Sequence, residues 1–147
     1  GFPAYSEDWA LYSEELAKEM NVYEGDPLGE LGMLQAALFR SARLVVDTGL
    51  HAKRWGREKA IETMTAIDGS PPSAAGTEIE RYCVWPGQAC SYMVGKLTWL
   101  RIRAKAKAAL GAKFDIRRFH DAALLSGAMP LTVLESVIDR YVERARG

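Results

Sequence analysis

The chain has 147 residues, of which 48% are hydrophobic and 26% are charged, as expected for a globular domain. Nineteen basic residues balance nineteen acidic ones, so charge gives no reason to expect a nucleic acid or an acidic membrane surface as a partner. No apolar run approaches the roughly 18 residues of a membrane-spanning helix, and we expect no span.

Apolar residues recur at helical spacing from the start of the chain. A first helix is predicted from about Glu7 to Met20, with an apolar stripe formed by Trp9, Tyr12, Leu16 and Met20. The sequence Gly25-Asp26-Pro27 then predicts a break. A second, long helix is expected from Leu28 to Thr48, and Gly49 is its predicted end. Its apolar residues gather on one side, at Leu31, Leu34, Leu38, Ala42 and Val45.

Helical spacing also dominates the remainder of the chain. The expected helices are residues 57–67, residues 77–110 with an interruption at Pro86-Gly87, residues 116–125, and residues 130–144. The stretch from Asp68 to Gly76 is rich in Gly, Ser, Ala and Pro and predicts a loop. Asp115 is a typical helix cap. Since no strand alternation or internal repeat occurs, we expect an all-α fold with residues 1–147 in one helical unit.

The stretch Ser6-Glu7-Asp8-Trp9-Ala10-Leu11-Tyr12-Ser13-Glu14 is the most informative motif. It resembles the third-ligand motif of the gluzincins, roughly Glu-Gly-aromatic-Ala-x-Tyr-x-Glu. Two histidines on one helix need a third ligand from another element, and water takes the fourth position on zinc. The resemblance makes Glu7 the metal ligand, and Tyr12 and Glu14 become candidates for orienting it. Asp8 stands where the motif has glycine.

The same motif also fits an ordinary solvated helix face. On a helical wheel Glu7 falls on the side of Glu14 and Lys18, away from the stripe that contains Trp9. Charged residues on that side of a surface helix need no functional explanation. From this segment alone, both the metal-ligand and the surface interpretation stay open.

The rest of the chain adds a second resemblance. Residues 7–20, 34–53, 81–92 and 114–131 resemble, block by block and in order, the C-terminal region of the bacterial family known as domain of unknown function 885. That family resembles gluzincin-type zinc peptidases, with His-Glu-x-x-His upstream of the Glu7 block. The motif is absent here, since the only histidines are His51 and His120. The resemblance implies that residues 1–147 are the C-terminal portion of a larger catalytic domain, with zinc bound in the full-length protein only.

Arg81 and Tyr82 form a second candidate constellation. Pro86 lacks an N–H, so the carbonyl of Tyr82 loses its helical partner and a kink is expected. Arg81-Tyr82 resembles an Arg-Tyr pair of the angiotensin-converting-enzyme-like peptidases, whose tyrosine hydroxyl stabilises the oxyanion. The alternative is structural, with one packed helical face formed by Tyr82, Trp85, Ala89 and Tyr92.

His51 is expected at a helix end, where it could donate to a substrate carbonyl or cap helix carbonyls. The family resemblance favours a catalytic role for His51 beside Tyr82 and Arg81. It also places Gln88 and Tyr92 in a substrate-binding role. His120, between Phe119 and Asp121, is typical of a hydrogen-bonded structural histidine.

Together these observations predict the C-terminal part of a zinc-dependent peptidase that hydrolyses peptide bonds. Its expected partners are a peptide substrate, and an upstream segment of the same protein or a second copy of the chain. The chain alone is expected to bind no zinc and to be inactive, because one carboxylate cannot supply three ligands. The alternative is an inactive helical fragment that acts as a scaffold or assembly module.

Overall fold

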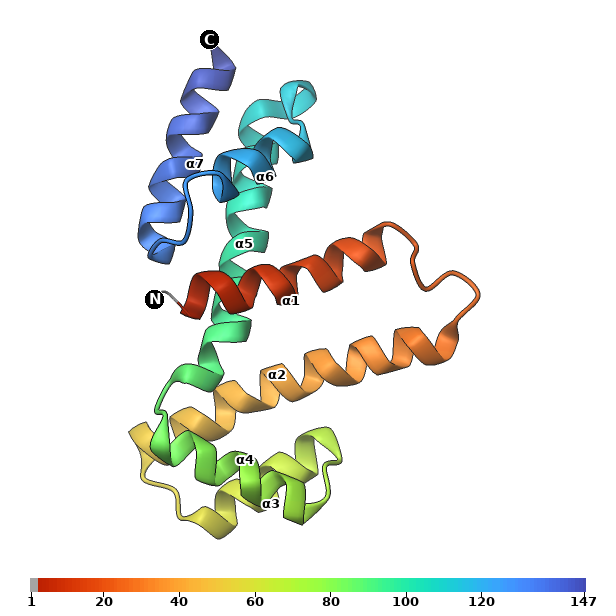
Figure 1. Ribbon diagram of the computed structural model, residues 1–147, viewed down its shortest axis with the longest axis vertical. Coiled ribbons are helices and arrows are strands. Elements are labelled where there is room, and N and C mark those ends of the chain that lie inside the picture. Colours follow the sequence, from red (N-terminus) through yellow and green to blue (C-terminus); the bar gives the residue numbers. More distant parts are fainter. Residues whose placement is uncertain (1–2) are drawn as a thin grey trace. The chain divides into compact units, whose positions relative to one another are not determined.

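The computed structural model describes residues 3–147, and the regular structure in this range is entirely helical (Figure 1). Its elements are α1 (Pro3–Glu19), α2 (Pro27–Lys53), α3 (Arg57–Asp68), α4 (Pro72–Val84), α5 (Gln88–Leu110), the short 3-10 helix η1 (Gly111–Lys113), α6 (Ile116–Leu124) and α7 (Leu131–Arg146). The predicted all-α class is confirmed. Within residues 3–147, no helix combines the length and the apolar character needed to cross a membrane.

The chain divides into two compact units. The terminal unit consists of the residues up to Tyr12 together with Val94–Gly147, and the central unit is Ser13–Met93. The boundaries fall inside α1 and α5, so both helices contribute residues to both units. Each unit has its own set of buried side chains.

The terminal unit is organised around the buried ring of Trp99 in α5. The rings of Trp9 and Tyr12 lie 5.1 and 5.3 Å from it, measured between ring centroids, and further aromatic contacts come from Tyr5 and Phe119. Such pairs contribute about 0.5–1.5 kcal/mol each beyond the area that they bury. Aromatic packing therefore fixes α1 and α6 within this unit.

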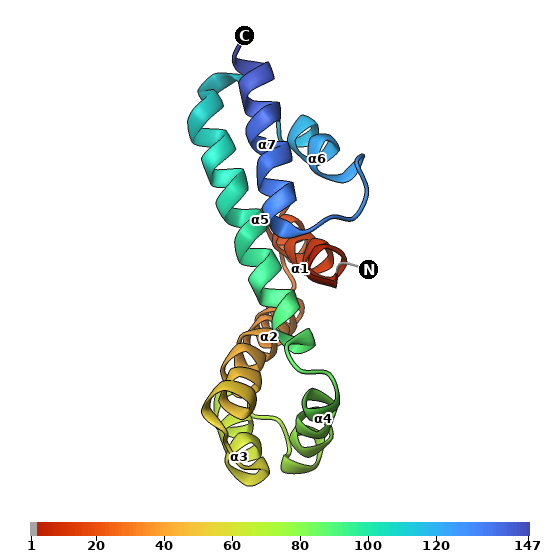
Figure 2. The same cartoon turned by 90° about the vertical axis from the view of Figure 1, so that its left-hand side faces the viewer.

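Figure 2 shows α7 beside α5, where ion pairs join Arg101 to Glu135 and Lys105 to Asp139.

Asp8 occupies an unexpected place in the same unit. Its side chain is completely buried, and neither carboxylate oxygen has a hydrogen-bond partner among the described residues. Burial raises the pKa of Asp8 to about 7, and the neighbouring charge of Glu7 adds to the rise. Room for the carboxyl group comes from Gly95 in α5, because a Cβ atom there would overlap the Asp8 side chain.

The buried face of α1 therefore differs from the predicted stripe. Tyr5, Asp8, Leu11 and Tyr12 are buried, Trp9 is half-buried, and Met20 lies beyond the helix with 76% of its surface exposed. The buried face is rotated by about one residue from the predicted stripe. The prediction missed this because a helical wheel based on apolar residues alone excludes a buried aspartate.

In the central unit, α3 and α4 lie side by side and pack against the C-terminal half of α2 (Figures 1 and 2). Their shared core contains Val46, Ala60, Met64, Ile79 and Tyr82. The expected apolar side of α2 is mostly not part of this core. Leu31, Leu34, Leu38 and Val45 are exposed, and only Ala42 of that set is buried. The face that packs carries Arg43 and Asp47 instead, which apolar periodicity cannot indicate.

The helix α2 continues one turn past its predicted end. Gly49 lies within the helix, where a Cβ atom would collide with the ring of Trp55. The helix ends at Lys53, followed by Arg54 in the left-handed region at φ 55°. His51 thus lies in the last turn of α2 rather than after the helix. The glycine serves close packing at this position, and the cap is formed by a residue that sequence statistics disfavour.

The predicted loop from Asp68 to Gly76 was too long. The helix α4 begins at Pro72, inside that stretch, because proline suits the first turn of a helix. The predicted break at Pro86-Gly87 is confirmed between α4 and α5. The predicted cap at Asp115 is also confirmed, since its carboxylate accepts hydrogen bonds from the backbone N–H groups of Arg117 and Arg118.

The contact between Gly95 and Asp8 gives a stability prediction. Gly95→Ala should lower the free energy of unfolding by about 1–3 kcal/mol, because the added methyl group overpacks a closed site. Gly32→Ala is the matched control within a helix, since a Cβ atom there meets nothing within 4 Å. It should raise stability by about 0.5–1 kcal/mol. Urea unfolding of both variants tests the pair, and equal stabilisation by the two substitutions would contradict the packing argument.

Candidate functional site

The last turn of α4 carries Arg81 and Tyr82, the two residues expected to act together. Tyr82 is completely buried in the core of the central unit, and its hydroxyl group has no hydrogen-bond partner among the described residues. Burial raises the pKa of Tyr82 well above its ordinary value, although the charge of Arg43 opposes the rise. The phenol therefore stays protonated at neutral pH, and its hydroxyl lies near the Glu78 carboxylate without forming a hydrogen bond of good geometry.

A charged network surrounds this hydroxyl. One oxygen of Glu78, Oε2, accepts hydrogen bonds from Nη2 of Arg81 at 2.9 Å and from Nη2 of Arg43 at 3.0 Å. The second branch of Arg81, Nη1, donates to Oε1 of Gln88 at 2.8 Å. Burial of Glu78 favours its neutral form and would raise its pKa. The hydrogen bond from Arg81 and the charge of Arg43 outweigh this effect and hold the pKa of Glu78 below its usual value. Two cations thus share one carboxylate, which leaves a positive excess near Tyr82.

Aromatic rings complete the arrangement. The guanidinium carbon of Arg43 lies 5.1 Å from the ring centre of Tyr92 and 4.3 Å from that of Phe39. Contacts of this kind favour a cation over the ring face. The structure therefore brings together four predicted site residues, Arg81, Tyr82, Gln88 and Tyr92. Trp85, which the packed-face alternative included, is instead 59% exposed.

His51 and Asp47 bind the break between α4 and α5. His51 Nε2 lies 3.1 Å from the Tyr82 carbonyl, which Pro86 deprives of its helical donor, so the tautomer with hydrogen on Nε2 is required. Both carboxylate oxygens of Asp47 accept the N–H of Gly87 at 3.1 Å. Gly87 has φ +78°, a conformation that suits glycine. Of the two sequence interpretations of His51, the capping contact is therefore present.

Arg43, Asp47 and Glu78 were not among the predicted site residues. A signal existed, because Arg43, Asp47 and His51 follow at steps of four and must share one face of α2. Charged residues in a row on a long helix usually indicate a solvated face, yet Arg43 and Asp47 are buried here. Only the contacts with α4 and α5 distinguish the two cases.

The residues of the Glu7 motif fall in different surroundings. Glu7 is half-buried and has no hydrogen-bond or ion-pair partner among residues 3–147. The hydroxyl of Tyr12 lies 2.9 Å from Nε2 of His120, so His120 is hydrogen-bonded as expected. Tyr12 belongs to the terminal unit, whereas Glu14 is half-buried in the central unit. No group of three His, Cys, Asp or Glu side chains suited to a metal ion occurs in the described range.

Comparison with known proteins places the chain in a family context. The sequence model of a family described as "Bacterial protein of unknown function (DUF885)" matches residues 1–138. A solved crystal structure, that of "the putative lipoprotein from Colwellia psychrerythraea", is 54% identical and superposes with a TM-score of 0.93. The match covers 97% of this chain and 24% of that protein, so the chain spans about a quarter of its relative's length. No protein of curated function matches.

The contact between Asp47 and Gly87 is testable by substitution. Asp47→Ala should lower the free energy of unfolding by about 1–3 kcal/mol, because it removes a part-buried hydrogen bond between a carboxylate and the Gly87 N–H. Asp47→Asn keeps one acceptor oxygen and should lose clearly less. Chemical unfolding measures the difference, and hydrogen exchange at the Gly87 amide should accelerate in the alanine variant alone. Equal losses in both variants would mean that the negative charge, not the backbone contact, is what matters.

Proposed function

This chain belongs to the bacterial DUF885 family, and we propose that it is the C-terminal, helical part of a zinc-dependent peptidase. The observation that supports the proposal best is the buried hydroxyl group of Tyr82, which makes no hydrogen bond of good geometry, with Glu78 near it and with Arg43 and Arg81 close to the ring. Buried polar groups without partners are rare in folded proteins, and each one needs an explanation. A donor reserved for a substrate atom is such an explanation.

Tyr82 is proposed to donate its hydrogen bond to the oxyanion that forms when a peptide carbonyl is attacked. Its raised pKa keeps the proton on the phenol, and the nearby cations favour negative charge on the substrate. The hydroxyl is fully covered in this structure. A substrate carbonyl can therefore reach it only when the side chains around it move, and Arg43 and Arg81 are the flexible candidates.

Glu7 is proposed as the third zinc ligand of the full-length protein. Its carboxylate has no competing partner among the described residues, which fits a group that binds a metal ion. The described residues contain no group of three His, Cys, Asp or Glu side chains suited to a metal ion, so the proposal assigns the remaining ligands to other segments of the full-length protein. When bound, zinc would supply an activated water molecule as the nucleophile. His51, by contrast, is supported as a residue that positions the Tyr82 backbone.

Tyr82→Phe separates catalysis from packing in the full-length protein. Because the buried hydroxyl makes no hydrogen bond of good geometry, its removal should not lower the melting temperature and should raise it slightly. If it stabilises the oxyanion, peptide turnover should fall about 100- to 1,000-fold at unchanged zinc content. Tyr12→Phe is the matched control, since its hydroxyl is bonded to His120 and its loss should cost on the order of 1 kcal/mol. Unchanged turnover in the Tyr82 variant rules out the catalytic role.

Glu7→Gln tests the metal assignment in the same protein. The amide keeps the size of the side chain but removes the charge that attracts Zn²⁺, so zinc content and peptide turnover should fall together. Glu24→Gln removes an exposed carboxylate outside α1 and should change neither. Elemental analysis after dialysis against a weak chelator gives the zinc content directly. Full zinc occupancy in the Glu7 variant would return Glu7 to the surface interpretation.

A further inference from the structure

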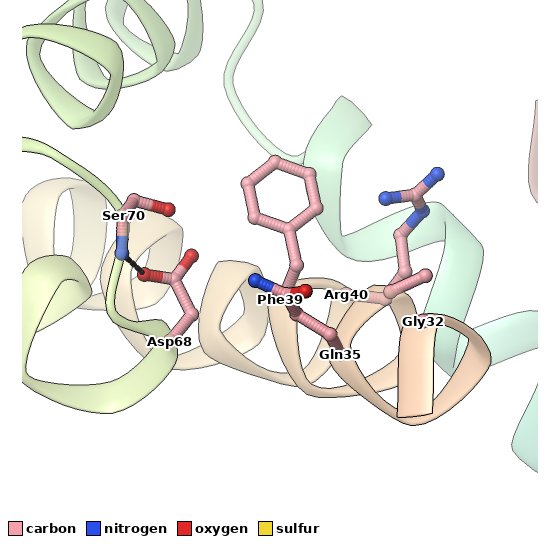
Figure 3. Close-up of a pocket in the computed structure, with 7 residues that line it drawn as sticks. Gly32, Gln35, Phe39, Arg40, Asp68 and Ser70 are labelled. Atoms are coloured by element: carbon pink, nitrogen blue, oxygen red, sulfur yellow. Dashed lines mark hydrogen bonds between the residues drawn. The ribbon is translucent and has the colours of Figure 1, made fainter. Parts of the chain in front are cut away.

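A cavity of about 340 Å³ lies in the central unit, and of the residues around Tyr82 described above only Phe39 lines it (Figure 3). One wall is a face of α2 that includes Gly32, Gln35, Phe39 and Arg40, and the other is the turn after α3 with Asp68 and Ser70. Gly32 adds no side chain to this wall, and a Cβ atom there would meet nothing within 4 Å. The size lies within the range of small-molecule sites in proteins.

Asp68 brings an unsatisfied negative group to this cavity. Its side chain is buried at 8% exposure, and Oδ1 accepts the N–H of Ser70 at 2.8 Å. The other oxygen, Oδ2, is covered and has no partner among the described residues, so a ligand reaches it only when neighbouring side chains move. Figure 3 shows Asp68 beside Ser70, with Phe39 next along the cavity lining. A buried carboxylate oxygen of this kind calls for a cation or a strong donor.

Arg40 brings the opposite charge. Its guanidinium carbon lies 5.2 Å from the ring centres of both Phe39 and Tyr92, which hold the group in place. No carboxylate of the described residues pairs with it, and its Nε is buried without a hydrogen-bond partner. Figure 3 shows Arg40 and Asp68 on either side of Phe39. An anion is the expected complement of this end of the cavity.

We propose that the cavity binds a small zwitterion, either a free amino acid or a short peptide. Its ammonium group pairs with Asp68, its carboxylate pairs with Arg40, and its carbon chain lies against the ring of Phe39. Both unpaired groups are then satisfied by one ligand, which neither a simple amine nor a simple carboxylate achieves. The cavity contains neither Glu7 nor Tyr82, so this proposal does not rest on the proposed function.

Calorimetric titration of the full-length protein tests the proposal. The protein carries Glu7→Gln and is stripped of metal, which disables the proposed peptidase site. Glycine, 4-aminobutyrate and 6-aminohexanoate place the two charges at increasing distances, and diglycine and tetraglycine represent peptides. Butylamine and butyrate carry one charge each. One of the zwitterions should bind with a stoichiometry of one, about tenfold or more tighter than either single-charge compound. The best length distinguishes an amino acid from a peptide.

Variants of the lining residues locate the binding. Asp68→Asn keeps the oxygen that accepts from Ser70, and Arg40→Gln keeps part of the side-chain stem, and each should weaken binding about tenfold or more. Gly32→Leu extends a side chain into open space and should abolish binding, whereas Gly32→Ala should leave most of it. Circular dichroism confirms that each variant is folded.

Three results would overturn the proposal. They are the absence of saturable binding by every zwitterion tested, equally tight binding of butylamine or butyrate alone, and binding that persists in folded Gly32→Leu. Comparison of Glu7→Gln with the unsubstituted protein adds a further check, since a ligand lost only in Glu7→Gln occupies the proposed metal site instead. Failure of the peptidase tests with retained zwitterion binding would leave this inference intact.

Discussion

The local structure of the central unit depends on one missing hydrogen bond. Pro86 has no N–H to donate, so α4 must end and the carbonyl of Tyr82 needs another donor. His51 supplies that donor, and Asp47 accepts the N–H of Gly87, the residue just before α5. Both contacts come from the same face of α2. They hold the end of α4 and the start of α5 against one helix, and the side chains on either side of the break are positioned as a consequence.

Those side chains include more charge than a helical core normally holds. Glu78 can bind two arginines because all three groups desolvate together, and a shared carboxylate satisfies part of each guanidinium. The sharing leaves Arg43 Nε and the Tyr82 hydroxyl without partners. A network optimised for stability alone would close these gaps, since each unsatisfied buried donor costs on the order of 1–3 kcal/mol. The gaps are therefore the part of the network where function is most reasonably sought.

Local chemistry made most of the helices predictable from sequence. The break at Pro86, the cap at Asp115 and the helical periods depend on residues within one turn of each other, and the structure has all of them. Long-range packing was not predictable in the same way. Periodicity identified the leucine side of α2, but it could not show that this side stays exposed while Arg43 and Asp47 turn inward. Asp8 was missed for a related reason, since its space exists only because a distant glycine faces it.

The unsatisfied polar groups of the chain differ in what surrounds them, and that difference decides how each is interpreted. Asp8 lies against Gly95, which leaves room for its carboxyl group and constrains the packing of α1 on α5. The Tyr82 hydroxyl is also covered, and the guanidinium carbons of Arg43 and Arg81 lie 6.0 and 5.2 Å from its ring centre. Asp68 lines a cavity that Arg40 also lines, although its unpaired oxygen is itself covered. A position on a cavity lining, rather than the number of unsatisfied atoms, therefore separates a candidate binding group from a structural one in this fold.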